Sequence, residues 1–227
     1  MKSSLSAGLA SIVCAMSITA CVEDKVFPSS TPKAPPTDTS TAGFLPADSI
    51  VAGSLVVNEF IAKGCSNTTP NCEISNYAAT ESENGKWFEI YNRHSKPIKL
   101  EAGKWFFSDS PTDKAKFKVS EDGVNVPARG YSVVFCDRKG TRTANGWHSN
   151  FSLASTAGSI AIHYNKDAAN TDTSKFLKVD LMSYAAINSD VEGYDGALDH
   201  TAWGRLEGGG GLPFKKCSQP TPGAKNK

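Results

Sequence analysis

From Leu55 onward the chain consists of short runs in which apolar and polar residues alternate, and this pattern limits it to a β-rich fold. The runs are rich in Val, Ile, Phe and Tyr, and turn residues such as Asn84-Gly85 and Asp122-Gly123 bound most of them. Alternation between such boundaries predicts β-strands. No window of the sequence carries a sustained apolar repeat of helical period. We expect strands over residues 55–62, 86–92, 104–109, 115–120, 131–137, 150–155, 159–165 and 175–184.

This succession of short strands predicts a β-sandwich or a β-barrel. Long loops are expected as insertions at 63–85, 138–149 and 185–200. Neither an internal repeat nor a second change of composition divides residues 55–227, which we therefore predict to form one domain. Apolar residues make up 39% of the 227-residue chain, which is enough for one packed core.

Residues 1–20 have the pattern of a bacterial export signal. Lys2 supplies a positive charge, and the uncharged stretch from Leu5 to Ile18 is too short for a spanning helix, which needs about 20 apolar residues. The following Ile18-Thr19-Ala20-Cys21 resembles the lipobox of bacterial lipoproteins. That resemblance implies cleavage before Cys21 and acylation of its thiol and new N-terminus. The alternative is an ordinary secretory signal with Cys21 as a bystander.

The residue after the lipobox bears on location. Val22 stands where many lipoproteins of the inner membrane carry Asp, so the resemblance implies an outer-membrane protein, periplasmic or surface-exposed. Cys14 lies within the apolar stretch and would leave with the signal. Several acyl chains give stable anchoring, whereas one chain alone holds only marginally.

Residues 21–54 are predicted to be a lipid-bearing Cys followed by a disordered stalk. Between Pro28 and Gly43, 11 of 16 residues are Pro, Ser or Thr, so this stretch has little apolar area to bury. The 33 residues between Cys21 and Leu55 would span roughly 100 Å if extended. Beyond Gly43, we expect the first apolar side chains to pack on the domain; they are Phe44, Leu45, Ile50 and Val51.

The charge balance argues against nucleic acid as a partner. The chain has 24 Lys and Arg against 23 Asp and Glu, and removal of Lys2 with the signal leaves 23 against 23. A neutral domain without a basic stripe offers no general attraction for a phosphate backbone. We therefore expect the membrane, through the lipid, and an envelope or surface protein or polysaccharide as partners.

The order of the strand motifs resembles the lamin tail domain, an immunoglobulin-like β-sandwich that also occurs in bacterial envelope proteins. Ser159 departs from the family pattern, which usually has Glu after the glycine at 158. The resemblance implies an immunoglobulin-like sandwich with long loop insertions. The motifs that carry it are Leu55-Val56-Val57-Asn58-Glu59-Phe60, Trp87-Phe88-Glu89-Ile90-Tyr91-Asn92, Ile98-Lys99-Leu100, Trp105 to Asp109, Pro127 to Phe135, Asn150 to Leu153 with Gly158, Thr201 to Arg205, and Pro220-Thr221-Pro222-Gly223-Ala224-Lys225-Asn226.

Two glutamates lie inside predicted strands and are the residues most suited to acid–base chemistry. Glu59 and Glu89 stand among apolar neighbours, so each must be hydrogen-bonded or paired if it is buried. They could serve a hydrolase as general acid and base, but a structural role bonded to loop backbone is the favoured interpretation. Trp87 and Trp105 are expected in the core, and Arg205 is expected to pair with a carboxylate or cap a loop.

Four cysteines remain after Cys14 and Cys21 are set aside, and an exported protein can keep disulfides. Of the three possible connectivities we favour Cys65–Cys72 together with Cys136–Cys217. A zinc site is the alternative, although a spacing of six residues between Cys65 and Cys72 suits zinc poorly.

The remaining candidate sites are few. The loop containing Asp190, Glu192, Asp195 and Asp199 is interleaved with glycine and is the best candidate for calcium; otherwise no cofactor is expected. Trp147 and His148, in the loop 144–150, are candidate contacts for a carbohydrate or protein ligand. The chain has no G-x-S-x-G, H-E-x-x-H or P-loop motif. We therefore expect a non-catalytic binding or scaffolding module, with an envelope hydrolase or a carbohydrate-binding surface protein as alternatives.

Overall fold

The computed structural model describes residues 43–64, 85–121, 124–143, 146–187, 189–194, 201–205, 209–217, 221–223 and 226. The expected signal, Cys21 and most of the expected stalk lie outside the described residues, as do Cys65, Cys72, Asp195 and Asp199. In the described part of the chain, no helix is long and apolar enough to cross a membrane.

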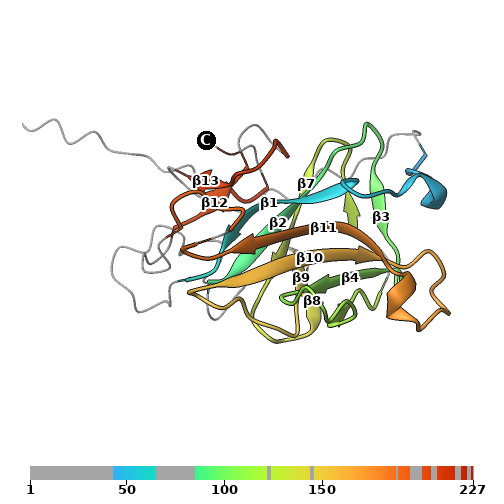
Figure 1. The fold of residues 1–227 in the computed structure, drawn as a ribbon. Coiled ribbons are helices and arrows are strands. Elements are labelled where there is room, and N and C mark those ends of the chain that lie inside the picture. Colours follow the sequence, from blue (N-terminus) through green and yellow to red (C-terminus); the bar gives the residue numbers. More distant parts are fainter. Residues whose placement is uncertain are drawn as a thin grey trace, which may run out of the picture.

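The regular secondary structure of the described residues is almost all β-strand, with only two short 3₁₀ helices, η1 (Ala47–Ser49) and η2 (Thr173–Lys175). Seven strands form one sheet in the order β13-β12-β1-β2-β7-β9-β8, here called the large sheet. Four strands form a second, the small sheet, in the order β11-β10-β4-β5, and β3 pairs with β6 (Figure 1). The strands are β1 (Leu55–Ile61), β2 (Trp87–Asn92), β3 (Ile98–Leu100), β4 (Trp105–Ser108), β5 (Phe117–Lys118), β6 (Val124–Val126), β7 (Tyr131–Phe135), β8 (Thr141–Thr143), β9 (Gly146–His148), β10 (Gly158–Tyr164), β11 (Leu177–Tyr184), β12 (Trp203–Gly204) and β13 (Lys215–Lys216).

The large and small sheets pack face to face, and the main core lies between them. Alternate residues of the longer strands point inward, and aromatic rings join the two layers. The ring centroids of Phe60 and Tyr184 lie 5.0 Å apart, and those of Phe88 and Phe107 lie 5.7 Å apart. Each pair joins a strand of the large sheet to a strand of the small sheet. The predicted all-β architecture is confirmed, and its sheets are open rather than closed into a barrel.

Most predicted strands appear at the expected positions, but residues 150–155 do not form one. The prediction there is wrong because side chains satisfy the backbone in place of a neighbouring strand. The Lys86 ammonium donates to the carbonyl of Leu153 at 2.7 Å, and the Tyr184 hydroxyl donates to that of Ala154 at 2.9 Å. Phe151 and Leu153 are nevertheless buried in the core, which explains the strand-like alternation of this loop.

The segment before β1 packs on the sandwich. Leu45 N–H donates to the carbonyl of Pro97 at 2.9 Å, Gly53 N–H donates to that of Val179 at 2.7 Å, and Ile50 is buried. Phe44 and Val51 remain exposed. This segment, with η1, lies at one end of the molecule, and β12, β13 and the C-terminus lie at the other (Figure 1).

Candidate functional site

A β-bulge in β1 brings two polar side chains to the same face of the large sheet. Val57 stands opposite Ile90, but two residues later Glu59 stands opposite Glu89, so one extra residue enters β1 at Asn58. Val57 and Phe60 point into the core. Asn58 and Glu59 therefore both face outward, beside Glu89 of the neighbouring strand.

The end of the chain covers these residues. Thr221 N–H donates to both carboxylate oxygens of Glu59, at 3.1 and 3.2 Å, and its hydroxyl donates to Oε2 at 2.9 Å. Glu89 accepts from the Asn58 amide at 2.8 Å and from the N–H of Gly223. Both glutamates are 0% exposed. We call residues 221–223 with Asn226 the C-terminal clasp.

Asn226 completes the clasp by reaching over a glycine. Its side-chain amide donates to the carbonyl of Arg205 at 2.7 Å and to that of Asn58 at 3.1 Å. Gly204 lies beneath it, opposite Glu59 in β12. A Cβ at Gly204 would clash with the Asn226 amide and would lie 2.8 Å from Sγ of Cys217. The close approach of Asn226 therefore requires glycine at this position.

Burial makes the two carboxylates much weaker acids than free glutamate. Desolvation raises the pKa of Glu59 to about 7, against the opposing effect of its bonds to Thr221. Desolvation also raises the pKa of Glu89 well above its ordinary value, and the adjacent Glu59 raises it further. Tyr131, whose hydroxyl is partly buried near both, has a pKa raised to about 12. A proton on this pair relieves the repulsion between two facing carboxylates at neutral pH.

This arrangement suits a structural role better than general acid–base catalysis. A catalytic carboxyl must reach a proton on the substrate. Here the clasp occupies that position and supplies an N–H donor to each group and a hydroxyl donor to Glu59. The favoured interpretation from the sequence, buried carboxylates bonded to loop backbone, agrees with this geometry.

Arg205 joins the same region to the small sheet. Its Nε donates to the carbonyl of Val57 at 2.6 Å, and its guanidinium lies 3.2 Å from Asp180 of β11. The same Asp180 carboxylate accepts from Val57 N–H at 2.8 Å, a donor that the bulge leaves outside the ladder. Arg205 also donates to the carbonyl of Gly210 at 3.1 Å. The prediction that Arg205 pairs with a carboxylate or caps a loop is confirmed.

The predicted disulfide between Cys136 and Cys217 is wrong. Both are free and buried, and they lie in different apolar clusters. Cys136 belongs to the core between the sheets, whereas Cys217 packs with Trp87 and Ala202 on the outer face of the large sheet. Burial raises the pKa of both thiols, that of Cys217 to about 12, so both stay protonated. The Cys217 thiol hydrogen-bonds to Glu59. The predicted Cys65–Cys72 bridge lies outside the described residues.

The predicted ligand contact at Trp147 and His148 is also wrong, because neither side chain is exposed. Trp147 is 1% exposed and packs edge-on against Phe117 in the core. His148 Nδ1 lies 2.6 Å from Asp137, and its other nitrogen lies 3.3 Å from the Thr143 hydroxyl. This buried pair ties the β8–β9 hairpin to the end of β7. Asp137 did not stand out in the sequence, because only the pairing of β9 with β7 brings it to His148.

The predicted calcium loop is only partly described. Asp190 accepts hydrogen bonds from the backbone and hydroxyl of Ser183, and Glu192 pairs with Lys215 at 3.4 Å. Asp195 and Asp199 lie outside the described residues. Within the described ranges, no group of three His, Cys, Asp or Glu residues could hold a metal. Calcium binding by this loop therefore stays a prediction.

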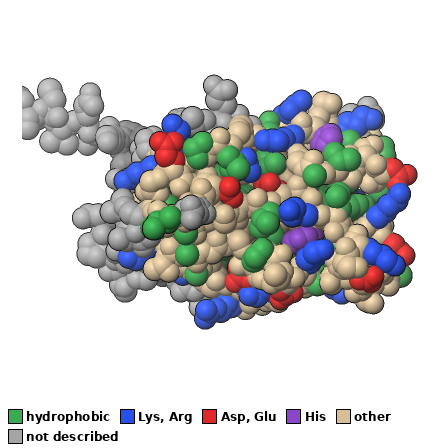
Figure 2. All heavy atoms as spheres, in the orientation of Figure 1, with side chains coloured by type: hydrophobic (Ala, Val, Ile, Leu, Met, Phe, Trp, Pro, Cys, Tyr) green, Lys and Arg blue, Asp and Glu red, His purple; other side chains and the backbone are tan. Residues whose placement is uncertain are grey.

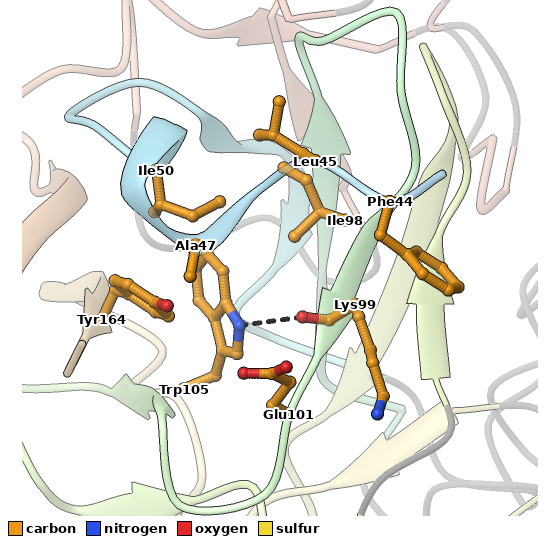
Figure 3. Close-up of a pocket in the computed structure, with 9 residues that line it drawn as sticks. All are labelled: Phe44, Leu45, Ala47, Ile50, Ile98, Lys99, Glu101, Trp105 and Tyr164. Atoms are coloured by element: carbon orange, nitrogen blue, oxygen red, sulfur yellow. Dashed lines mark hydrogen bonds between the residues drawn. The ribbon is translucent and has the colours of Figure 1, made fainter. Parts of the chain in front are cut away.

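A small pocket lies between the segment before β1 and the edge of the sandwich. Trp105 lies at its centre, between Tyr164 on one side and Ile98 on the other, and Phe44 and Ile50 also line it (Figure 3). The Trp105 indole donates to the carbonyl of Lys99 at 3.1 Å. The cavity of about 90 Å³ is far below the roughly 300 Å³ of small-molecule sites. It can hold a few waters but not a sugar ring.

Comparison with protein-family models, with curated proteins and with solved structures found no match.

The raised pKa of Glu59 predicts that stability falls with rising pH. Free glutamate titrates near 4.5, and Glu59 titrates near 7 in the folded state, so the folded protein holds the extra proton between these values. The stabilisation that this proton gives the folded state is fully present below pH 4.5 and is lost as pH rises through 7. The free energy of unfolding therefore falls by about 3 kcal/mol over this range. Glu59→Gln should remove this part of the slope. Urea unfolding between pH 4.5 and 8 measures it.

The exposed carboxylate Glu192 provides the control, because Glu192→Gln should leave the wild-type pH profile in place. A Glu59→Gln variant whose free energy of unfolding changes with pH as steeply as that of the wild type would contradict the buried, protonated pair.

A second prediction concerns the glycine under the clasp. Gly204→Ala should lower the free energy of unfolding by about 1–3 kcal/mol, because the added methyl displaces Asn226. Gly211→Ala is the matched control: a Cβ there meets no atom within 4 Å, so its effect should stay within about 0.5 kcal/mol. Equal urea midpoints for the two variants would show that Asn226 does not pack on Gly204.

Proposed function

We propose that the protein is a lipid-anchored, non-catalytic binding module of the bacterial cell envelope, built on a lamin-tail type of immunoglobulin-like sandwich. The observation that carries this proposal is the convergence of the sequence motifs on one network. Asn58 and Glu59, Glu89, Gly204 with Arg205, and the Thr221–Asn226 motif come from four separate motifs of the family pattern. They meet on the outer face of the large sheet.

The convergence supports the family resemblance because each motif residue has a partner in another motif. Glu59 is bonded to Thr221, Glu89 to Asn58 and Gly223, and Asn226 to the carbonyl of Arg205. Residues far apart in the sequence thus depend on each other for satisfied hydrogen bonds. These hydrogen bonds explain why the motif residues occur together, and the explanation needs no catalytic role for them.

The burial of the two glutamates favours a binding module over a hydrolase. A hydrolase that used Glu59 or Glu89 would need the clasp to leave the sheet, which would remove the Thr221 donors from Glu59 and the Gly223 donor from Glu89. The carbohydrate-binding alternative loses its aromatic candidate, because Trp147 is part of the core. A polysaccharide or protein partner would therefore bind elsewhere on the surface.

The ends of the molecule fit a tethered arrangement. The chain joins the sandwich at residues 43–50, at the opposite end from β12, β13 and the C-terminus (Figure 1). A stalk anchored through Cys21 would therefore hold the sandwich by one end. The outer face of the small sheet, which the clasp does not cover, would then be available to a partner.

The anchor predicts a specific chemical state of Cys21. In bacterial cells, mass spectrometry should find the mature chain starting at an acylated Cys21, and the protein should fractionate with membranes. Cys21→Ser should abolish the acylated form and release the protein from the membrane fraction. Cys14→Ser should do neither, because Cys14 lies in the removed segment. An unmodified Cys21 in a membrane-free wild-type protein would overturn the anchor.

A further inference from the structure

A row of basic and aromatic side chains crosses the outer face of the small sheet. Lys178 of β11 stands opposite His163 of β10, His163 opposite Phe106 of β4, and Phe106 opposite Lys118 of β5. Directly opposed residues share one face of a sheet. The neighbours of His163 in β10, Ile162 and Tyr164, belong to the core, so the row faces outward.

His163 is the most deeply buried member of this row, and one of its ring nitrogens has no hydrogen-bond partner among the described residues. Its side chain is 1% exposed, and within the described residues its Nδ1 atom has no hydrogen-bond partner. Burial, together with the positive charges of Lys114 and Lys178, lowers the pKa of His163 to about 4. The imidazole is therefore neutral at pH 7. A buried polar atom without a partner costs free energy, which a bound acceptor would recover.

The lysines around His163 are not neutralised by acidic side chains of the described residues. Within the described ranges, Lys114, Lys118 and Lys178 form no ion pair. The acidic side chains near the row have other partners. Asp109 pairs with Lys116, Asp180 turns inward to Arg205, and Asp172 pairs with Lys175 at 3.8 Å and acts only at longer range on Lys114. Figure 2 looks onto this face and shows a histidine flanked by lysine or arginine side chains over β10.

We propose that Lys178, His163 and Lys114 form a binding site for a phosphate group. This inference rests on the proposed binding function and names the chemical class of its ligand. A phosphate offers several acceptor oxygens, enough for two ammonium groups and one imidazole N–H at once. Phe106 and Phe176, whose ring centroids lie 4.7 Å apart, form an apolar wall beside His163. That wall limits the water that competes for the anion.

The phosphate could belong to a lipid headgroup or to a soluble molecule, and the two sources share the same contacts. The headgroups of the anchoring membrane are within reach of a stalked domain. A phosphate free in solution or on a soluble molecule would meet the same outward-facing row.

The test follows the ring signals of His163 by NMR in the full mature chain carrying Cys21→Ser, which removes the lipid. Inorganic phosphate is added at constant ionic strength, with sodium chloride as the counter-titration, and His163→Gln assigns the signals. We expect a saturable shift with phosphate and none with chloride. Lys178→Gln and Lys114→Gln should each weaken binding about tenfold, as expected for loss of one charge-assisted contact. Lys216→Gln, on an exposed strand of the other sheet, should bind as the wild type does.

A second arm identifies the source. Vesicles of phosphatidylethanolamine with phosphatidylglycerol are compared with vesicles of phosphatidylcholine and with inorganic phosphate. Lysine-dependent shifts of His163 on anionic vesicles assign the site to lipid headgroups, and shifts with inorganic phosphate alone assign it to soluble phosphates. A His163 signal that does not move with either probe, or moves equally in the lysine variants, overturns the site. The readout does not depend on acylation of Cys21, so the anchor and the phosphate site can fail separately.

Discussion

The structure depends on burying two facing carboxylates on the outer surface of a sheet. Glu59 and Glu89 stand directly opposite each other, where two negative charges would repel, and neither reaches water. Their burial requires donors, and apart from the Asn58 amide on Glu89 these come from a segment more than 130 residues further along the chain. The bulge at Asn58, the glycine at 204 and the Thr221–Asn226 motif all serve this one requirement. The end of the chain is thereby made part of the sheet surface.

This requirement also divides the molecule into surfaces with different roles. The clasp covers the outer face of the large sheet around the glutamates, and the segment before β1 closes the opposite end over Trp105. The outer face of the small sheet carries no such cover over Lys178 and Lys118, and its one buried histidine has an unused nitrogen. The clasp thus lies on one sheet, and the proposed phosphate site lies on the other.

The sequence predicts the strands well where alternation and burial agree, as in β1, β2, β7, β10 and β11. It fails at 150–155, where side chains from Lys86 and Tyr184 replace a neighbouring strand, because such donors come from distant segments. It identifies Glu59 and Glu89 as buried and bonded, but not their partners. It fails for Cys136 and Cys217 because the face on which each thiol lies depends on strand pairing. The basic row at His163 requires the register of four strands, which no local pattern contains.

The most direct test of this account is hydrogen exchange at the two clasp amides that bond to the glutamates, Thr221 N–H and Gly223 N–H. Below pH 6 both should be strongly protected against exchange, and the protection of both should decrease in Glu59→Gln and Glu89→Gln variants. Exchange at the rate of an unstructured peptide in the wild-type protein would contradict the claim that the C-terminus holds the buried pair.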